Sequence, residues 1–213
     1  MRGRFLVIEG IDGCGKTTQL NELHEWLPIS GIMPRGVKLE VTREPGGTSL
    51  GNVLRRILLD PDGEYNLEPL TELLLYAADR AQHVRQVILP ALERGDWVLS
   101  DRFCGSTIAY QGYGRQLSLT IISQLEEMVT SGLQPDLTLW LALSPEDAII
   151  RIKDRSVDRI ENNGIIFLKQ VAVGFEKLAH ERFWTQIPAQ HSKTEVSTAI
   201  KGVIGTVFSN LAT

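Results

Sequence analysis

Short apolar runs of strand type alternate with amphipathic stretches of helix type along almost the whole chain. Runs rich in Val, Leu, Ile and aromatic residues predict β-strands near Arg4–Glu9, Val37–Thr42, Trp97–Ser100, Leu137–Leu143 and Phe183–Ile187. Apolar residues three and four apart predict helices near Lys16–Trp26, Ser49–Leu59, Glu68–Glu93, Ser118–Ser131, Pro145–Lys153, Ile165–His180 and Lys193–Leu211. This alternation predicts a three-layer α/β fold, in which a five-stranded, mostly parallel sheet has helices on both faces. Ligands of such sheets bind at the carboxyl ends of the strands.

Length and composition suit one folded domain spanning residues 1–213. The chain has 213 residues, 43% apolar and 23% charged, enough to bury a sizeable core. A net charge of −4 argues against a surface for nucleic-acid polymers or membranes, and no apolar run is long enough for a signal segment or a membrane span. The two cysteines, Cys14 and Cys104, are expected in loops and form no disulfide framework, which favours a reduced, cytoplasmic setting. Cys14 is by position a candidate reactive thiol.

A glycine-rich sequence of specific spacing follows the first predicted strand. It matches G-x-x-x-x-G-K-[ST], the phosphate-binding P-loop, and stands between a strand-like and a helix-like run as that motif requires. Its glycines allow a tight turn, so that backbone N–H groups converge on phosphate oxygens. Lys16 is expected to reach the β- and γ-phosphates, and the Thr17 hydroxyl to hold Mg²⁺. The residues expected to bind the nucleotide are Gly10, Ile11, Asp12, Gly13, Cys14, Gly15, Lys16, Thr17 and Thr18.

Two further predicted strands are followed directly by charged residues. Arg43 and Glu44 follow the second strand, and Asp101 and Arg102 end the third. An aspartate at a strand end beside a P-loop can hold Mg²⁺ or its water shell, and an arginine offers a planar fork to a phosphate. The alternative for Asp101-Arg102 is a surface ion pair.

The long middle helix carries a polar face, and a hydroxyl-rich segment lies downstream of it. Tyr76, Asp79, Arg80 and His83 are three or four residues apart and so share one face. Tyr76 suits stacking on a nucleobase or, alternatively, core packing, whereas His83 is better explained as a structural histidine. The segment Ser106-Thr-Ile-Ala-Tyr-Gln-Gly112 offers hydroxyl, amide and phenol groups that suit a sugar or base edge.

A cationic segment follows the helix that begins at Pro145. It contains Arg151, Lys153, Arg155 and Arg159 among several acidic residues, and the stretch 151–163 is predicted to form a mobile lid. Cationic loops that close over a transferring phosphate stabilise its charge and exclude water. The alternative is a solvated helix end of mixed charge.

In combination these motifs resemble those of one family, the bacterial thymidylate kinases, which are P-loop nucleoside-monophosphate kinases. The resemblance runs from about Arg4 to at least Leu178, and it is weaker in the residues that follow. It rests on Glu9-Gly-Ile-Asp-Gly-Cys-Gly-Lys-Thr-Thr18, Thr42-Arg-Glu-Pro-Gly-Gly-Thr48, Tyr76-Ala-Ala-Asp-Arg-Ala-Gln-His83, Asp101-Arg102, Ala109-Tyr-Gln-Gly112 and Asp158-Arg-Ile-Glu161. It implies a P-loop NTPase fold, transfer of the γ-phosphoryl of ATP to dTMP with Mg²⁺ as cofactor, and a homodimer.

The resemblance also implies roles for individual residues. Asp12 would contact the acceptor's 3′-hydroxyl, Arg43 and Arg102 would hold its phosphate, and Tyr110 would crowd the 2′ position. Tyr76 would stack on thymine where the family usually has Phe, and Arg80 would read a thymine carbonyl. The acceptor set is Asp12, Glu44, Pro45, Tyr76, Arg80, Arg102, Ser106, Thr107, Tyr110 and Gln111. The P-loop lacks an arginine, so Arg151, Lys153 or Arg155 would supply the extra cation. Phe103 stands where Tyr or His is usual.

Two other functions remain open from the sequence. A related kinase could take another nucleotide, or a deoxynucleoside whose 5′-hydroxyl would need a carboxylate base such as Glu9 or Glu44. A nucleotide-dependent switch protein is the other alternative. The second set of strand-end arginines favours a kinase, because an acceptor anion needs its own cations.

Overall fold

The central element is a five-stranded sheet in which every pairing is parallel, in the order β2-β3-β1-β4-β5. The computed structural model describes residues 2–60, 65–153 and 158–209. The strands are β1 (Phe5–Glu9), β2 (Leu39–Arg43), β3 (Trp97–Asp101), β4 (Leu137–Ala142) and β5 (Thr185–Pro188). All five strands predicted from the sequence are therefore present. β5 begins later than expected, because Phe183 is 93% exposed and has a left-handed φ of 52°, which a strand does not accommodate.

The predicted helices are all present among the described residues, and two further helical elements occur that the sequence pattern did not predict. The helices are α1 (Lys16–Trp26), α2 (Ser49–Leu59), α3 (Pro69–His83), α4 (Leu89–Glu93), α5 (Cys104–Thr107), α6 (Leu119–Thr130), α7 (Pro145–Ile152), α8 (Gly164–Glu181) and α9 (Lys193–Phe208). A π-helical turn, Val84–Ile88, joins α3 to α4, so the predicted long helix is nearly continuous. The missed elements are α5 and the π-helical segment Ile108–Gly114 that extends it. These segments contain Gly105, Gly112 and Gly114, and because glycine disfavours helices, the sequence did not predict helices there.

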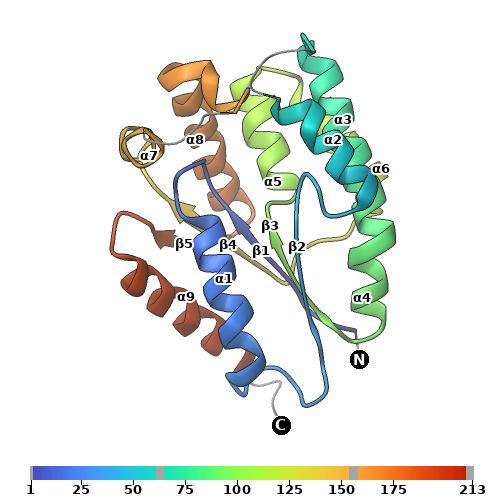
Figure 1. Ribbon diagram of the computed structural model, residues 1–213, viewed down its shortest axis with the longest axis vertical. Coiled ribbons are helices and arrows are strands. Elements are labelled where there is room, and N and C mark those ends of the chain that lie inside the picture. Colours follow the sequence, from blue (N-terminus) through green and yellow to red (C-terminus); the bar gives the residue numbers. More distant parts are fainter. Residues whose placement is uncertain (1, 61–64, 154–157, 210–213) are drawn as a thin grey trace.

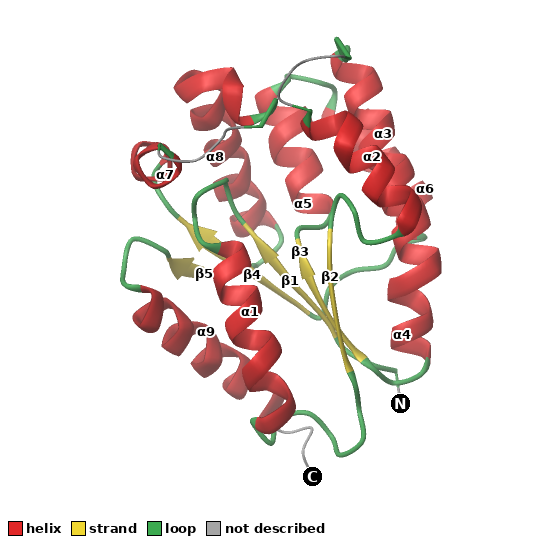
Figure 2. Ribbon diagram, viewed as in Figure 1, coloured by secondary structure: helices red, strands yellow, loops and turns green. Residues whose placement is uncertain are grey.

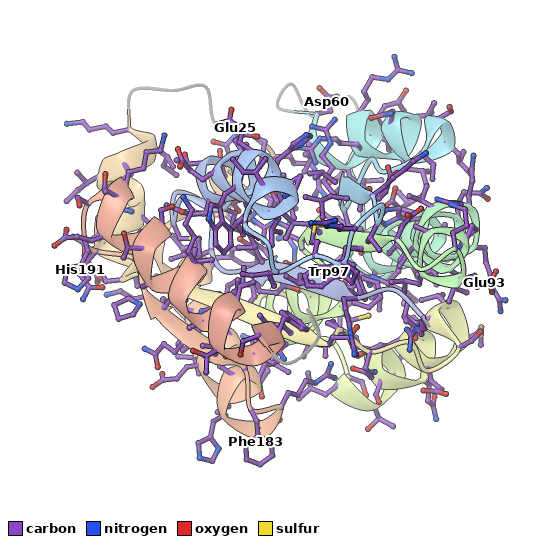
Figure 3. The ribbon with its side chains drawn as sticks, turned by 90° about the horizontal axis from the view of Figure 1, so that it is seen from below. Glu25, Asp60, Glu93, Trp97, Phe183 and His191 are labelled. Carbon is purple, nitrogen blue, oxygen red and sulfur yellow. The ribbon has the colours of Figure 1, made fainter. Side chains whose placement is uncertain are left out.

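The core lies on both faces of the sheet, because successive strand residues point to opposite sides. Phe5 and Val7 of β1 pack with Val84 and Ile88. Leu6 and its neighbour Ile8 belong to the larger cluster, which takes in Leu23 of α1 and Ile200 of α9. Figure 1 shows α1 and α9 side by side on one face of the sheet. In Figure 3, Trp97 lies among the packed side chains, whereas Phe183 and His191 lie at the edge of the molecule.

The carboxyl ends of β1, β2 and β3 meet at one end of the sheet. Figure 2 shows the loops after these strands at the end away from the two chain termini. The register places Ile8 of β1 opposite Asp101 of β3, and Arg43 of β2 opposite the same Asp101. The P-loop and both charged strand ends are thereby brought to the same place.

Candidate active site

The loop between β1 and α1 has the backbone that its glycines predicted. Gly10, Gly13 and Gly15 all have positive φ, of 144°, 82° and 98°. A Cβ on Gly13 would lie 2.8 Å from the Ala148 carbonyl oxygen, so packing also demands glycine there. Lys16 Nζ donates to the carbonyl oxygens of Gly10, at 3.0 Å, and Ile11, at 2.8 Å. The loop thus holds its lysine against its own backbone at the start of α1.

Two of the non-glycine side chains of this loop, Ile11 and Cys14, point into the protein interior. Ile11 and Cys14 are each 2% exposed, so they contribute backbone to the loop while their side chains pack in the core. Burial raises the pKa of the Cys14 thiol, which is the opposite of what a reactive cysteine needs. Burial therefore argues against Cys14 as the reactive thiol that its position made a candidate. Cys104, also expected in a loop, begins α5 and is likewise buried.

A hydroxyl and a carboxylate from neighbouring elements meet where a metal ion was expected. Thr17 Oγ1 donates to Asp101 Oδ2 at 3.3 Å, while Asp101 Oδ1 is buried and has no hydrogen-bond partner. An unsatisfied buried carboxylate oxygen is costly unless a cation or water completes it. No cluster of three or more His, Cys, Asp or Glu side chains suited to a metal occurs among the described residues. Mg²⁺ at a nucleotide site needs only one or two protein oxygens, so Thr17 and Asp101 fit it.

Arg102 occupies the junction between the P-loop and the segment after β3. Its φ of 71° is left-handed, a strained conformation for a residue with a side chain. The guanidinium donates to the Gly10 carbonyl at 3.0 Å, to Ser106 Oγ at 2.9 Å and to Asp12 Oδ1 at 2.5 Å. Asp12 Oδ2 accepts from Tyr110 Oη at 2.6 Å. Although burial by itself raises it, the charges of Arg102 and Lys16 hold the pKa of the Asp12 carboxyl below its usual value.

A second network lies behind this junction and is buried. Arg80 donates from Nε to Glu44 Oε2 at 2.7 Å, from NH1 to Thr107 Oγ1 at 2.9 Å and from NH2 to the Phe103 carbonyl at 3.0 Å. The other Glu44 oxygen is 2.8 Å from His83 Nδ1. Burial raises the pKa of Glu44, but Arg80 and His83 outweigh that effect and hold it below its usual value. Each oxygen of the Glu44 carboxylate thus accepts a bond from, or lies in hydrogen-bond contact with, a buried nitrogen donor.

Two cavities adjoin at these residues. The smaller has a free volume of about 550 Å³, and its walls carry the whole predicted acceptor set, Tyr76 included, together with Ile160. The larger, of about 1670 Å³, lies over the P-loop and is lined by Lys16, Thr17, Arg43 and Arg151 among others. Asp12, Glu44, Arg55, Arg102 and Asp158 line both. We call them the acceptor cavity and the P-loop cleft.

Comparison with known proteins identifies the family. The sequence profile described as Thymidylate kinase matches residues 8–200. The chain belongs to the thymidylate kinase family. It is 59% identical over 211 residues to a thymidylate kinase of Prochlorococcus marinus (strain MIT 9303), covering 99% of this chain and 98% of that one. It is 61% identical over 201 residues to one from Synechococcus sp. (strain WH7803), covering 94% of each. A crystal structure of thymidylate kinase from Ehrlichia chaffeensis superposes with a TM-score of 0.78 at 30% identity, over 96% of this chain and 100% of that one.

The described residues bring the acceptor set expected of a thymidylate kinase together, whereas the lid set is dispersed. Every residue of the acceptor set from Asp12 to Gln111 lines the acceptor cavity, whereas Arg43, also predicted to hold the acceptor phosphate, lines the P-loop cleft. Arg151 lines the P-loop cleft and donates to the Ala189 carbonyl at 2.8 Å. Lys153 is exposed and lines neither cavity, and Arg155 lies outside the described residues. Arg159, grouped with these cations in the sequence, instead pairs with Glu72 at 2.6 Å.

Phe103, which stands where the family usually has Tyr or His, has a packing explanation. Its ring meets that of Phe5 edge-on, with centroids 5.0 Å apart, and Arg80 lies over its face. It belongs to the apolar cluster behind the site, where a polar tip would need a partner.

Two carboxylates that a deoxynucleoside kinase might use as a base are already bonded. Glu9 is 1% exposed and accepts from the backbone of Phe103 and Ser106 and from the Ser106 hydroxyl. It holds the start of α5 rather than facing either cavity. Glu44 has both oxygens occupied, as described above. Glu9 lines neither cavity, and Glu44, which lines both, has its charge already paired with Arg80, which makes it a poor base for a substrate hydroxyl.

Several residues of this thymidylate kinase site were missed in the sequence. Arg55 of α2 lines both cavities and donates to the Pro45 carbonyl at 2.9 Å. Burial and the neighbouring charge of Arg43 lower its pKa. Glu72 and Arg115 lie beside the acceptor cavity and were also missed. Arg55 could have been found from its place on the amphipathic helix that follows the Arg-Glu-Pro-Gly-Gly-Thr block. The adjacent Arg56 made it look like one of several exposed charges on that helix. No described helix is long and apolar enough to span a membrane.

Proposed function

We propose that this protein transfers the γ-phosphoryl group of ATP to dTMP, giving ADP and dTDP. ATP would bind over the P-loop and dTMP would fill the acceptor cavity. The observation that carries the proposal is the wall shared by the two cavities, which contains Asp12, Arg55 and Arg102. An acceptor phosphate at this wall would lie between a base pocket on one side and the donor phosphates on the other. A nucleotide switch has no need of the second cavity.

For phosphoryl transfer, the protein mainly has to position the two nucleotides and neutralise the negative charge of their phosphates. The acceptor phosphate is already nucleophilic, so no side chain need act as a strong general base. Lys16 would contact the β- and γ-phosphates, and Arg102 and Arg43 would hold the acceptor phosphate. Thr17 and Asp101 would hold Mg²⁺, which would neutralise charge on the donor phosphates. Of Arg151 and Lys153, the lid cations within the described residues, Arg151 lines the P-loop cleft.

The acceptor cavity supplies contacts for sugar and base. Tyr76 forms a wall on which thymine would stack, and Arg80 would donate to a thymine carbonyl from its unoccupied N–H bonds. Asp12 would accept from the 3′-hydroxyl, while Tyr110, bonded to Asp12, would fill the space that a 2′-hydroxyl needs. Ser106, Thr107 and Gln111 complete the wall near the base edge.

The test is ADP release from Mg-ATP with each of dTMP, dUMP, dCMP, dGMP, AMP and thymidine as acceptor. We expect strong preference for dTMP. Preference for another acceptor would retain the P-loop roles and overturn the roles of Tyr76 and Arg80. Acceptor-independent hydrolysis would instead support a nucleotide switch.

We also propose that the enzyme is a cytoplasmic homodimer. Leu70 and Leu74, on successive turns of α3, are 52% and 48% exposed, and α2 and α6 pack beside them. A second copy would cover this apolar face. Both cysteines are unpaired, as a reducing compartment favours. Sedimentation equilibrium of the wild type and of Leu74→Glu tests the dimer, and a monomeric wild type would contradict it.

A further inference from the structure

A buried carboxylate on α3 accepts hydrogen bonds from three residues in two separate parts of the chain. Glu72 is 0% exposed. Its Oε1 accepts from Gln111 Nε2 at 2.9 Å and from Arg115 Nε at 3.2 Å. Its Oε2 accepts from Arg115 NH2 at 3.1 Å and from Arg159 NH2 at 2.6 Å. A buried carboxylate costs free energy unless it is paired with a cation and hydrogen-bonded. The four hydrogen bonds offset this cost for Glu72, and they hold its carboxylate in one orientation.

The donors to Glu72 are themselves held by other groups. Arg159 donates from Nε to the Leu58 carbonyl at 2.9 Å, which ties it to the end of α2. Arg115 donates from NH1 to Asn163 Oδ1 at 2.6 Å, and its guanidinium lies 4.9 Å from the centroid of the Phe167 ring. Burial raises the pKa of Glu72, but the bonds from Arg115 and Gln111 outweigh that effect and hold it below its usual value. Glu72 is therefore a charged anchor for both arginines.

Two of these bonds reach the wall of the acceptor cavity. Asp158 and Ile160, on either side of Arg159, line the cavity. The ion pair of Arg159 with Glu72 therefore fixes the position of the chain segment that forms this part of the cavity wall. Gln111 also lines the cavity, and a carboxylate accepts only, so the amide nitrogen of Gln111 must face Glu72. Its carbonyl end is thereby turned away from Glu72. Glu72 itself is not among the cavity's lining residues.

We infer that Glu72 is a positioning residue for the acceptor nucleotide. It fixes the orientation of the Gln111 amide and, through Arg159, the wall formed by residues 158–160, without touching either substrate. This inference rests on the proposed function, because its measurable consequence is the affinity for dTMP. It gives Arg159 a role different from that of a cation that contacts the transferring phosphoryl group.

The test compares Glu72→Gln with a matched control elsewhere in the fold. Glu126→Gln removes another buried helical glutamate that pairs with an arginine, Arg182, through bonds of 2.9 and 3.1 Å, and Glu126 lines neither cavity. We expect Glu72→Gln to raise KM for dTMP about tenfold, with kcat and KM for ATP within about twofold of wild type. Glu126→Gln should change none of the three, although it lowers stability.

Arg159→Gln and the double variant show whether the effect passes through Arg159. Arg159→Gln should also raise KM for dTMP. The KM of the double variant should not exceed that of the more affected single variant, because both substitutions remove the same Glu72–Arg159 ion pair. If Glu72→Gln does not fold, Arg159→Gln, which leaves Glu72 paired with Arg115, still decides the matter. Unchanged KM for dTMP in the folded variants, or an equal rise in Glu126→Gln, would overturn the inference. Absence of dTMP-dependent ADP release from the wild type would instead refute the proposed function.

Discussion

The acceptor cavity and the P-loop cleft differ in how their polar side chains are held before a ligand arrives. On the acceptor side, Arg80, Glu44 and Asp12 are bonded to other side chains, as are the residues behind them. On the donor side, Lys16 rests on backbone carbonyls and Asp101 keeps one buried oxygen without a partner. The polar groups around the acceptor cavity are thus preorganised by other side chains, as the proposed recognition of a nucleotide would require, whereas those at the P-loop keep contacts that phosphates and a cation would replace or complete if the proposed function holds.

This contrast has a chemical reason. A nucleobase and a deoxyribose are recognised by a few directed hydrogen bonds, which lose strength if the partners move. Phosphates are bound largely by backbone N–H groups and by point charges that can swing into place. Changes on the acceptor side should therefore appear in KM for dTMP, and changes on the donor side in kcat or in the requirement for Mg²⁺.

The largest effect is expected at Lys16, on the donor side. Lys16→Ala removes a charge that would stabilise the transferring phosphoryl group, and we expect kcat to fall on the order of 10²-fold or more. Binding of dTMP, measured by calorimetry without ATP, should change little. Lys193→Ala, an exposed lysine paired with Glu22, is the control. Near-normal turnover in Lys16→Ala would contradict the assignment of kcat effects to the P-loop cleft and of KM effects to the acceptor cavity.

Asp101→Asn is expected to shift the metal requirement of the donor side. Asn keeps the bulk of the side chain but loses the charge of the Asp101 carboxylate, so the Mg²⁺ concentration for half-maximal activity should rise about 10- to 100-fold. Excess EDTA should abolish transfer in both proteins. Asp136→Asn is the matched control, since Asp136 bonds Arg4 and the Phe5 backbone at the other end of β1. An unaltered Mg²⁺ titration would exclude Asp101 as a ligand.

On the acceptor side, Tyr110→Phe probes preorganisation directly. It removes the 2.6 Å bond that holds Asp12 and leaves the ring in place against Phe175. Losing one such bond should raise KM for dTMP about fivefold while kcat stays close to wild type. Tyr113→Phe is the control, because Tyr113 lines neither cavity and faces Lys177. Equal behaviour of the two variants would mean that Asp12 does not need the bond from Tyr110, because Arg102 alone holds it.

The same contrast explains what the sequence could and could not predict. The P-loop was predictable in detail because its glycines and Lys16 are fixed by local backbone geometry. The acceptor residues were identified by family motifs, and the structure places them around one cavity. Glu72 was not foreseen, because its four bonds come from residues 39 to 87 positions away. Arg159 was grouped with the lid cations, because a sequence shows charge but not pairing.

The smallest effect concerns the support behind the acceptor cavity. Asp79, 1% exposed, accepts from the Gly46 backbone N–H at 3.0 Å and so holds the loop after β2. Burial, with the nearby negative charge of Glu44, raises the pKa of Asp79 to about 6 from 3.8. The folded state therefore binds the proton more tightly than the unfolded chain. The stability that this proton contributes is fully present below pH 3.8 and is lost as the pH rises through about 6.

Asp79→Asn removes this titration and keeps an oxygen for the Gly46 N–H. Between pH 5.5 and 7.5 the wild type should lose about 1 kcal/mol of unfolding free energy relative to Asp79→Asn, as measured by urea denaturation at each pH. Titration of all other groups is common to both proteins and cancels in the difference. A pH-independent difference would show that Asp79 is ionised throughout this range. In that case the acceptor side would carry another fixed charge that its hydrogen bonds must hold.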